Sequence, residues 1–157
     1  MVSRLRIDRR QGAASVEMAL LAPLLIYLLF AVIEFGVMVG DVVHIHQVAR
    51  EGARAAVVGA TPTTIDARVE AAAAPMDTTG MQTVYEFRSY DIATGTWSEW
   101  QTLGTEDTAN NASPDDQVRA TITYPHKLLL PGLFGTWADD PESGTITLKA
   151  SIIMRRE

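Results

Sequence analysis

Residues 9–36, RRQGAASVEMALLAPLLIYLLFAVIEFG, decide the fold of this chain. Residues 18–33 carry no charge, and Glu17 is the single charge between residues 13 and 33. At about 1.5 Å of rise per residue, a helix of that length spans roughly 30 Å, the thickness of a bilayer's hydrocarbon core. We therefore expect a transmembrane helix over residues 13–40. A carboxylate inside such a helix is costly, which indicates that Glu17 serves a function.

Four arginines and one aspartate lie in residues 1–12, giving this leader a charge of +3. Under the positive-inside rule we expect the leader in the cytoplasm and residues 41–157 outside it, with one crossing of the inner membrane. The whole chain carries −6, so residues 13–157 carry −9. That acidic balance argues against binding nucleic acid through a general basic surface. The leader has no apolar periodicity and is expected to be flexible.

Two ordinary explanations of this N-terminus compete. A secretory signal peptide also places a basic region before an apolar one, but its apolar run is usually shorter and ends at an A-x-A site. This apolar run is longer, and no clear A-x-A site closes it. A plain anchor would instead keep its leader and never leave the lipid. Composition alone leaves both alternatives open.

The spacing around Gly12 resembles the processing site of type IV prepilins, which a peptidase cuts after a glycine and whose mature chain has glutamate fifth. Counted from Ala13, Glu17 is fifth. The longer string GAASVEMALLAPLL at residues 12–25, with IEFG at 33–36, is similar to the TadE-like family. Members of that family are minor pseudopilins of the tight-adherence (Tad, Flp-type) pilus. The resemblance covers a quarter to a third of the chain.

The resemblance implies a non-enzymatic minor pseudopilin, cut between Gly12 and Ala13. It would be incorporated into a pilus for adhesion or secretion, or prime its assembly, and could thus lie outside the cell. The implied partners are the prepilin peptidase, the major Flp pilin, a TadF-like minor pilin, the inner-membrane platform with its ATPase, and membrane lipid. One alternative is a permanently anchored extracytoplasmic binding or adhesion module. Another is an anchored enzyme, although no catalytic constellation is visible.

Two further residues mark the expected membrane helix. Pro23 removes one backbone donor and clashes toward the carbonyl of Ala19, so a helix kink is expected there. Glu34 lies roughly 32 Å along the axis from Ala13, at the far side of the membrane. Its carboxylate is expected to be hydrated at that interface, with a contact to another subunit as the alternative. Glu34 therefore marks the membrane exit.

Beyond the membrane the helix is expected to continue over residues 41–58. Alanines and Gly52 recur there at three- and four-residue spacing, an amphipathic pattern with a shallow buried stripe. Small side chains of this kind allow a helix to approach another helix or a sheet closely. A second helix is expected over residues 64–74, with Thr63 and Asp66 at the spacing of a capping box.

In the region of residues 83–157, apolar and polar residues alternate with a period of two, which is typical of strands. The expected strands cover residues 83–91, 117–124 and 145–155, and residues 97–101 return as a hairpin partner. The apolar segment 125–143 is expected to be a loop packed on or near the sheet. The predicted fold is therefore α+β: a long pilin-like N-terminal transmembrane helix, a short second helix, and a small antiparallel sheet of three to four strands.

The sequence offers little metal or cofactor chemistry. It has no cysteine, which excludes a disulfide framework and a thiolate metal site. His44 and His46 point to different faces of one helix and His126 is distant, so no metal and no cofactor is expected. The acidic pairs at 115–116 and 139–140 are interpreted as solvated loop charges, with calcium binding as the alternative.

Five aromatic residues fall in or near the first expected strands. Aromatic residues of a small sheet more often form its core, which is the interpretation we favour. The alternative is an exposed patch that serves adhesion. The residues are Tyr85, Phe87, Tyr90, Trp97 and Trp100.

Overall fold

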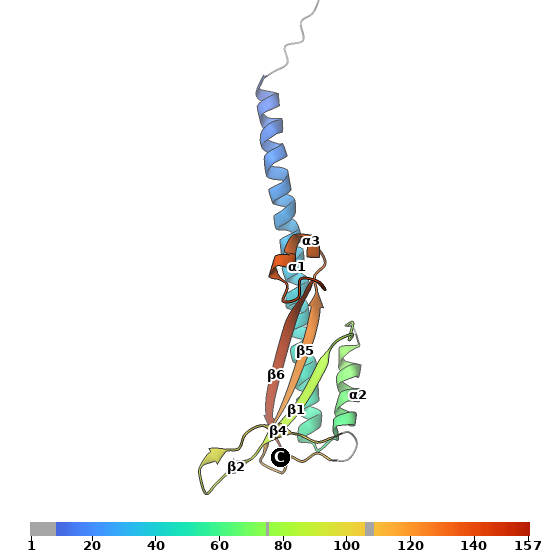
Figure 1. The fold of residues 1–157 in the computed structure, drawn as a ribbon, viewed down its shortest axis with the longest axis vertical. Helices are drawn as coiled ribbons and strands as arrows, with labels where there is room; N and C mark the ends of the chain where they lie inside the picture. Colours follow the sequence, from blue (N-terminus) through green and yellow to red (C-terminus); the bar gives the residue numbers. More distant parts are fainter. Residues whose placement is uncertain (1–8, 75, 106–108) are drawn as a thin grey trace, which may run out of the picture. The chain divides into compact units, whose positions relative to one another are not determined.

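The structure is a computed structural model. It describes residues 9–74, 76–105 and 109–157. Contacts divide the chain into two compact units, with the boundary between Val37 and Met38. We call them the N-terminal unit and the C-terminal unit. A single continuous helix, α1 (Arg9–Val57), contributes to both (Figure 1).

Helix α1 begins earlier than the sequence argument expected. It starts at Arg9 rather than at Ala13, because arginine and glutamine are good helix formers and favour extending the helix backwards. Residues 1–8 lie outside the described residues, so the expected flexibility of the leader stays a prediction. The helix also runs without interruption through Pro23, and the kink expected there stays a prediction.

The part of α1 within the C-terminal unit buries a stripe of mostly small side chains. Gly52 lies in this stripe, and a Cβ placed on it would be 3.0 Å from Cγ2 of Val69 and 3.5 Å from Cε1 of Tyr85. The expected close approach of a small-residue helix stripe to neighbouring elements is thus confirmed. The fully buried apolar members of the stripe are Ile45, Val48, Ala49, Ala53, Ala55 and Ala56.

The second helix, α2 (Pro62–Ala73), begins two residues before the expected start. Pro62 occupies its first turn, where proline's missing N–H costs nothing. The capping-box assignment of Thr63 and Asp66 is wrong, since Thr61 is the N-cap and no side chain caps the helix. The carboxylate of Asp66 instead accepts hydrogen bonds from Tyr85 Oη at 2.8 Å and Thr83 Oγ1 at 3.0 Å. These bonds tie α2 to the sheet.

Four antiparallel strands form the main sheet in the order β4-β1-β5-β6 (Figure 1). Their bounds are β1 (Gln82–Arg88), β4 (Gln101–Thr102), β5 (Gln117–Lys127) and β6 (Thr145–Arg155). The inward alternation expected on β5 is confirmed, because Val118, Ala120 and Ile122 are fully buried. With α1 and α2 against that face, the α+β prediction with a small antiparallel sheet is confirmed.

Strand β5 is longer than expected because it continues through Pro125. β1 stops pairing with β5 at Thr123, whereas β6 pairs as far as Lys127. Proline cannot donate to a neighbouring strand, so it is tolerated where one side of the strand is unpaired. The expected loop that follows contains a short helix α3 (Pro131–Phe134) and a 3-10 turn η1 (Gly135–Trp137).

The expected hairpin after β1 is split between two pairings. β2 (Tyr90–Asp91) and β3 (Thr96–Trp97) pair with each other in a separate two-stranded ribbon. Residues 101–102 return to the main sheet as β4, beside β1. The ribbon therefore projects as a hairpin outside the main sheet, which places its side chains outside the core.

The polar loop before β5 is held by specific hydrogen bonds. Asn110 Nδ2 donates to the carbonyl oxygens of Ala56 at 2.8 Å and Ala60 at 2.9 Å. Ala56 lies in the last turn of α1, where carbonyl groups lack intrahelical donors, and Ala60 follows the end of the helix. The guanidinium of Arg156 donates to Asn110 Oδ1 and to the carbonyl oxygen of Ala112. One amide thus connects the end of α1 to the end of β6.

Candidate functional site

The N-terminal unit exposes apolar side chains along α1. The segment Ala14–Val57 is long and apolar enough to cross a membrane, and none of its most apolar window is buried. A core helix of a soluble protein could be equally apolar but would be covered by its own chain. The large exposed apolar residues of this part include Val16, Met18, Leu20, Leu21, Leu24, Leu25, Ile26, Leu28, Leu29, Val32 and Ile33.

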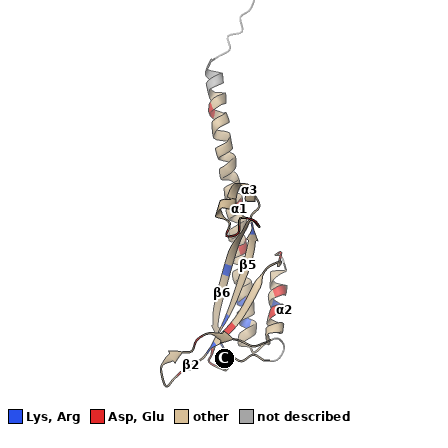
Figure 2. Ribbon diagram, in the orientation of Figure 1, with Lys and Arg blue, Asp and Glu red and all other residues tan. Residues whose placement is uncertain are grey.

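Glu17 lies within this exposed apolar surface. Its side chain is exposed, and so are its sequence neighbours Val16 and Met18, at 62% and 59%. Figure 2 shows that Lys, Arg, Asp and Glu gather on the sheet and α2, whereas the apolar part of α1 is nearly free of charge. A carboxylate surrounded by apolar surface is stable in lipid or in an assembly only when a cation or hydrogen-bond donors meet it.

The expected processing site, Gly12 and Ala13, lies in the first turns of α1. The first four N–H groups of a helix have no intrahelical partner, so this end opens at low cost. Glycine lowers helix stability further, by about 1 kcal/mol relative to alanine.

Glu34 differs from its expected environment. Its side chain is only 5% exposed, so the expectation of a hydrated carboxylate is wrong for this chain. Distance along the axis fixes the depth of a residue in a membrane, but it does not determine what surrounds the side chain. The assignment of Glu34 as the membrane exit stays a prediction.

The three histidines take separate positions within the C-terminal unit. His44 Nε2 donates to the carbonyl oxygen of Ala72 at 3.1 Å, and His46 bonds the carbonyl oxygen of Val42. His126 is 2% exposed, and its Nδ1 lies 2.7 Å from Oδ2 of Asp41. This pair joins α1 to β5. Among the described residues, no group of three His, Asp or Glu side chains could hold a metal ion.

The aromatic residues divide between the core and the surface. Tyr85 is 7% exposed and Phe87 packs against the core, as favoured from the sequence. Tyr90 and Trp97 are 47% and 37% exposed, so the core interpretation is wrong for them. Trp100 is partly exposed. The alternation of residues could not show this, because the projecting ribbon removes these residues from the sheet's two-residue pattern.

An alternating stack of guanidinium and indole groups lies near the ribbon. Arg88 Cζ lies 5.0 Å from the ring centroid of Trp97 and 4.6 Å from that of Trp100. Arg119 Cζ also lies 4.0 Å from the centroid of the Trp100 ring, and the Arg119 guanidinium pairs with Glu86 at 2.6 Å. Sequence reasoning missed this stack. Its arginines lie at outward-facing positions of β1 and β5. That alternation was the only feature of the sequence that could have indicated these contacts.

The acidic pairs are less uniform than expected. Asp116 is 5% exposed and its Oδ2 accepts a hydrogen bond from the Ser113 amide, so the solvated interpretation is wrong for it. Asp115 is exposed and pairs with Arg155 at 2.9 Å. Asp139 and Asp140 are exposed. Hydrogen bonds from Ser143 and from the Glu142 amide lower the pKa of Asp140.

Comparison with known proteins bears on the N-terminal part of the chain. The family model described as TadE-like protein matches residues 12–54. This match confirms the resemblance to the TadE-like family over that segment. Neither the curated proteins nor the solved structures gave a match. The matched segment includes Gly12, Glu17 and Glu34, but it ends within α1, before α2 and the sheet begin.

Proposed function

We propose that this chain is a minor pseudopilin of a Tad (Flp-type) pilus, with a structural rather than an enzymatic role. The observation that carries the proposal is the exposed apolar part of α1, with Glu17 placed five residues after Gly12. The TadE-like match over the same segment supports it. The folded C-terminal unit would be the exported part of the subunit.

The exposed apolar surface must be shielded from water both before and after assembly. Before assembly, the lipid of the inner membrane covers residues 14–33, with the arginine-rich leader in the cytoplasm. After assembly, the helices of neighbouring pilins cover the same side chains. A helix that is apolar on all sides suits both environments, because neither lipid nor a surrounding helix bundle leaves one face in water.

Processing after Gly12 would prepare this helix for assembly. Cleavage removes the net positive charge of the leader, which otherwise holds that end of the chain at the cytoplasmic face. It also creates a new α-amino group at Ala13, with an ordinary pKa near about 8. The new cation offers a partner for Glu17, either four residues along the same helix or on a neighbouring subunit. Pairing between subunits would fix the axial register of the helices.

The proposed partners follow from these steps. The prepilin peptidase makes the cut, and the inner-membrane platform with its ATPase moves the processed subunit. The major Flp pilin and a TadF-like minor pilin would pack against the apolar helix. The C-terminal unit has a folded core of its own, which suits a subunit placed at one end of the pilus or primed for its assembly better than a bulk filament subunit.

The test is the mass of the mature chain. The protein is expressed with the prepilin peptidase of the same system, and intact-mass and N-terminal analyses are expected to show a chain that begins at Ala13. Gly12→Val should leave the leader in place, because a side chain there obstructs the approach of the scissile bond. Gly36→Val is the matched control, since a Cβ at Gly36 meets nothing within 4 Å.

A wild-type chain that keeps its leader in the presence of active peptidase would contradict the proposal. It would favour the permanently anchored extracytoplasmic module instead. Removal of a longer segment ending beyond the apolar helix would favour a secretory signal peptide. The three outcomes differ in mass by whole segments, so one measurement separates them.

A further inference from the structure

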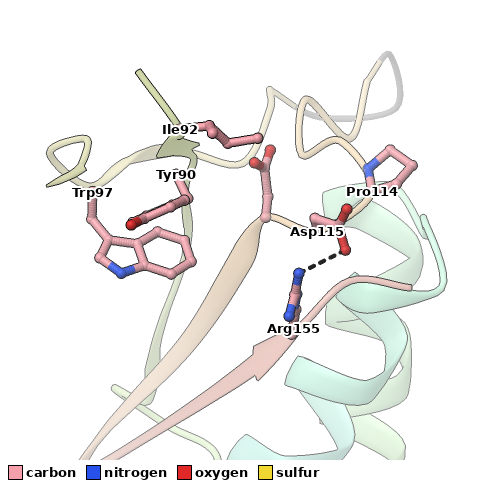
Figure 3. Close-up of a pocket in the computed structure, with 7 residues that line it drawn as sticks. Tyr90, Ile92, Trp97, Pro114, Asp115 and Arg155 are labelled. Carbon is pink, nitrogen blue, oxygen red and sulfur yellow. Dashed lines mark hydrogen bonds and ion pairs between the residues drawn. The ribbon is translucent and has the colours of Figure 1, made fainter. Parts of the chain in front are cut away.

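A cavity of about 470 Å³ opens between the β2–β3 ribbon and the end of β6 (Figure 3). Tyr90, Ile92 and Trp97 line one side, and Asp115 and Arg155 line the other. A cavity of this size falls within the range of small-ligand sites, which combine apolar surface with a few fixed polar groups. All of its lining belongs to the C-terminal unit and is independent of the proposed pilin role.

The apolar side is made of rings that contribute nothing to the protein's core. Tyr90 and Trp97 are cross-strand partners, with their ring centroids 5.1 Å apart and tilted by 56°. The guanidinium of Arg88 packs on the Trp97 ring. Two hydrogen bonds to Gln117 Oε1 fix the position of that guanidinium. The rings are therefore fixed in place while they remain 47% and 37% exposed.

The polar side is presented by a constrained turn. Residues 113–116 close with a hydrogen bond from the Asp116 amide to the Ser113 carbonyl oxygen at 3.1 Å. Asp115 has a φ of 75°, which is the mark of a type II turn and favours glycine at that position. Aspartate there accepts backbone strain. In this turn the Asp115 carboxylate lies 2.9 Å from Nη2 of Arg155, at the cavity wall.

We propose that this cavity binds a neutral carbohydrate, with one sugar ring on the aromatic side. A pyranose has an apolar C–H face that packs on aromatic rings and a rim of hydroxyl groups that both donate and accept. The Asp115 carboxylate accepts from such hydroxyls, and the Arg155 guanidinium donates to them. Tyr and Trp supply rigid contact area at a low cost in conformational entropy.

The charge arrangement favours a neutral ligand. The lining carries Asp115, Asp116 and Arg155, so an anion would meet two carboxylates and a cation would meet the Arg155 guanidinium. The Asp115–Arg155 pair itself is weak, because its side chains are 79% and 67% exposed, so both groups can still bond a ligand. A hydroxyl group can bond both members without separating them. A proline-rich peptide also packs on exposed Tyr and Trp, but it lacks hydroxyl donors for Asp115 and would use only the apolar side.

The experiment uses the full chain in lipid nanodiscs, since alkyl glycoside detergents would compete for the site. The probes are the methyl glycosides of glucose, galactose, mannose and N-acetylglucosamine, with decaproline as the peptide probe. Binding is followed by saturation-transfer NMR and tryptophan fluorescence. At least one glycoside is expected to saturate with a Kd on the order of 1 mM or tighter, while decaproline does not bind.

Two variants assign the binding to this cavity. Trp97→Ala is expected to abolish it, whereas Trp137→Ala, which changes another exposed indole outside the cavity, should leave it unchanged. Asp115→Gly removes the carboxylate but suits the positive φ, so the turn should stay folded. Loss of that acceptor is expected to weaken binding by about tenfold, as one hydrogen bond of ordinary net strength would.

Several results would overturn the proposal. One is that no glycoside saturates up to its solubility limit, and another is that Trp97→Ala and Asp115→Gly bind as well as wild type does. Binding of decaproline with the same dependence on Trp97, and of no glycoside, would assign the cavity to a peptide instead. Because none of these measurements depends on cleavage after Gly12, failure here leaves the pilin proposal standing.

Discussion

The two parts of α1 show how one helix can meet two different surroundings. Over residues 14–37 its large apolar side chains face outward, and Leu20 is 74% exposed. Over residues 38–57 its buried stripe is built largely from alanine and Gly52, against the sheet and α2. The large side chains are thus outside and the small ones are inside, the reverse of a simple hydrophobicity ranking.

The difference teaches what each part requires. Burial in lipid or among neighbouring helices is favoured by a long segment with a large apolar area, which many side chains of similar size can supply. Packing on a twisted sheet rewards close approach, which only small side chains allow at particular positions. Substitutions in the exposed part should therefore affect membrane placement or assembly, and substitutions in the buried part should affect the free energy of unfolding.

The largest expected effect separates assembly from folding through Glu17→Gln. This change keeps the size of the side chain but removes the charge that would meet the Ala13 amine. We expect membrane insertion and the unfolding of the C-terminal unit to be unchanged, with incorporation into pili reduced at least about tenfold, the effect of losing about 1.4 kcal/mol. Incorporation is measured by co-purification with the other pilins from a deletion strain that expresses the variant.

Glu70→Gln provides the matched control, because Glu70 is an exposed carboxylate of α2 in the C-terminal unit. It should assemble normally. Equal piliation by the Glu17→Gln variant and wild type would remove the assembly role of Glu17 and would favour a side chain that merely reaches the cytoplasmic headgroups.

The next effect tests packing within the buried part. Gly52→Leu forces a side chain into a space where even a Cβ would lie 3.0 Å from Val69. We expect the C-terminal unit to lose about 1–3 kcal/mol of stability, because overpacking displaces the neighbouring side chains. The measurement is the urea midpoint of the full chain in micelles, followed by tryptophan fluorescence.

Gly36→Leu makes the same change in the same helix on the other side of the unit boundary. A Cβ at Gly36 meets nothing within 4 Å, so its urea midpoint should match that of wild type. The contrast between the two parts of α1 would fail if the two variants lost equal stability.

The sequence was sufficient for features that depend on local pattern. The apolar run predicted the long helix, and alternation predicted β6 with its observed bounds, Thr145–Arg155. Small residues near Gly52 predicted a close approach of elements, which the packing against Val69 confirms. Each of these features repeats over several residues of a single element, so one chain segment contains the whole signal.

Features that join distant segments could not be predicted in this way. Asp66 looks like a capping residue within its own helix, yet its partners are Thr83 and Tyr85 on β1. Trp97 looks like a strand residue, yet its ribbon stands outside the main sheet. The cavity beside it depends on Asp115 and Arg155, which are 40 residues apart. Such pairs are set by topology, which no local spacing contains.

The smallest expected effect concerns the buried part alone and appears at high pH. Burial and the hydrogen bond to Asp66 raise the pKa of Tyr85 well above its ordinary value of 10.0. Burial and the nearby charges of Asp41 and Asp77 also raise the pKa of Tyr124. An unfolded tyrosine releases its proton near about pH 10, while the folded one keeps it. The folded state then binds more protons than the unfolded state.

With more protons bound in the folded state, stability must fall as pH rises, by up to about 1.4 kcal/mol per pH unit for each such tyrosine. The urea midpoint should thus be constant from about pH 7 to 9 and decline above about pH 10. Tyr85→Phe should lower the midpoint at pH 8, because Asp66 loses a donor, but should make the alkaline decline shallower. A decline of equal slope in the Tyr85→Phe, Tyr124→Phe and wild-type proteins would show that the raised pKa values of these two buried phenols do not cause it.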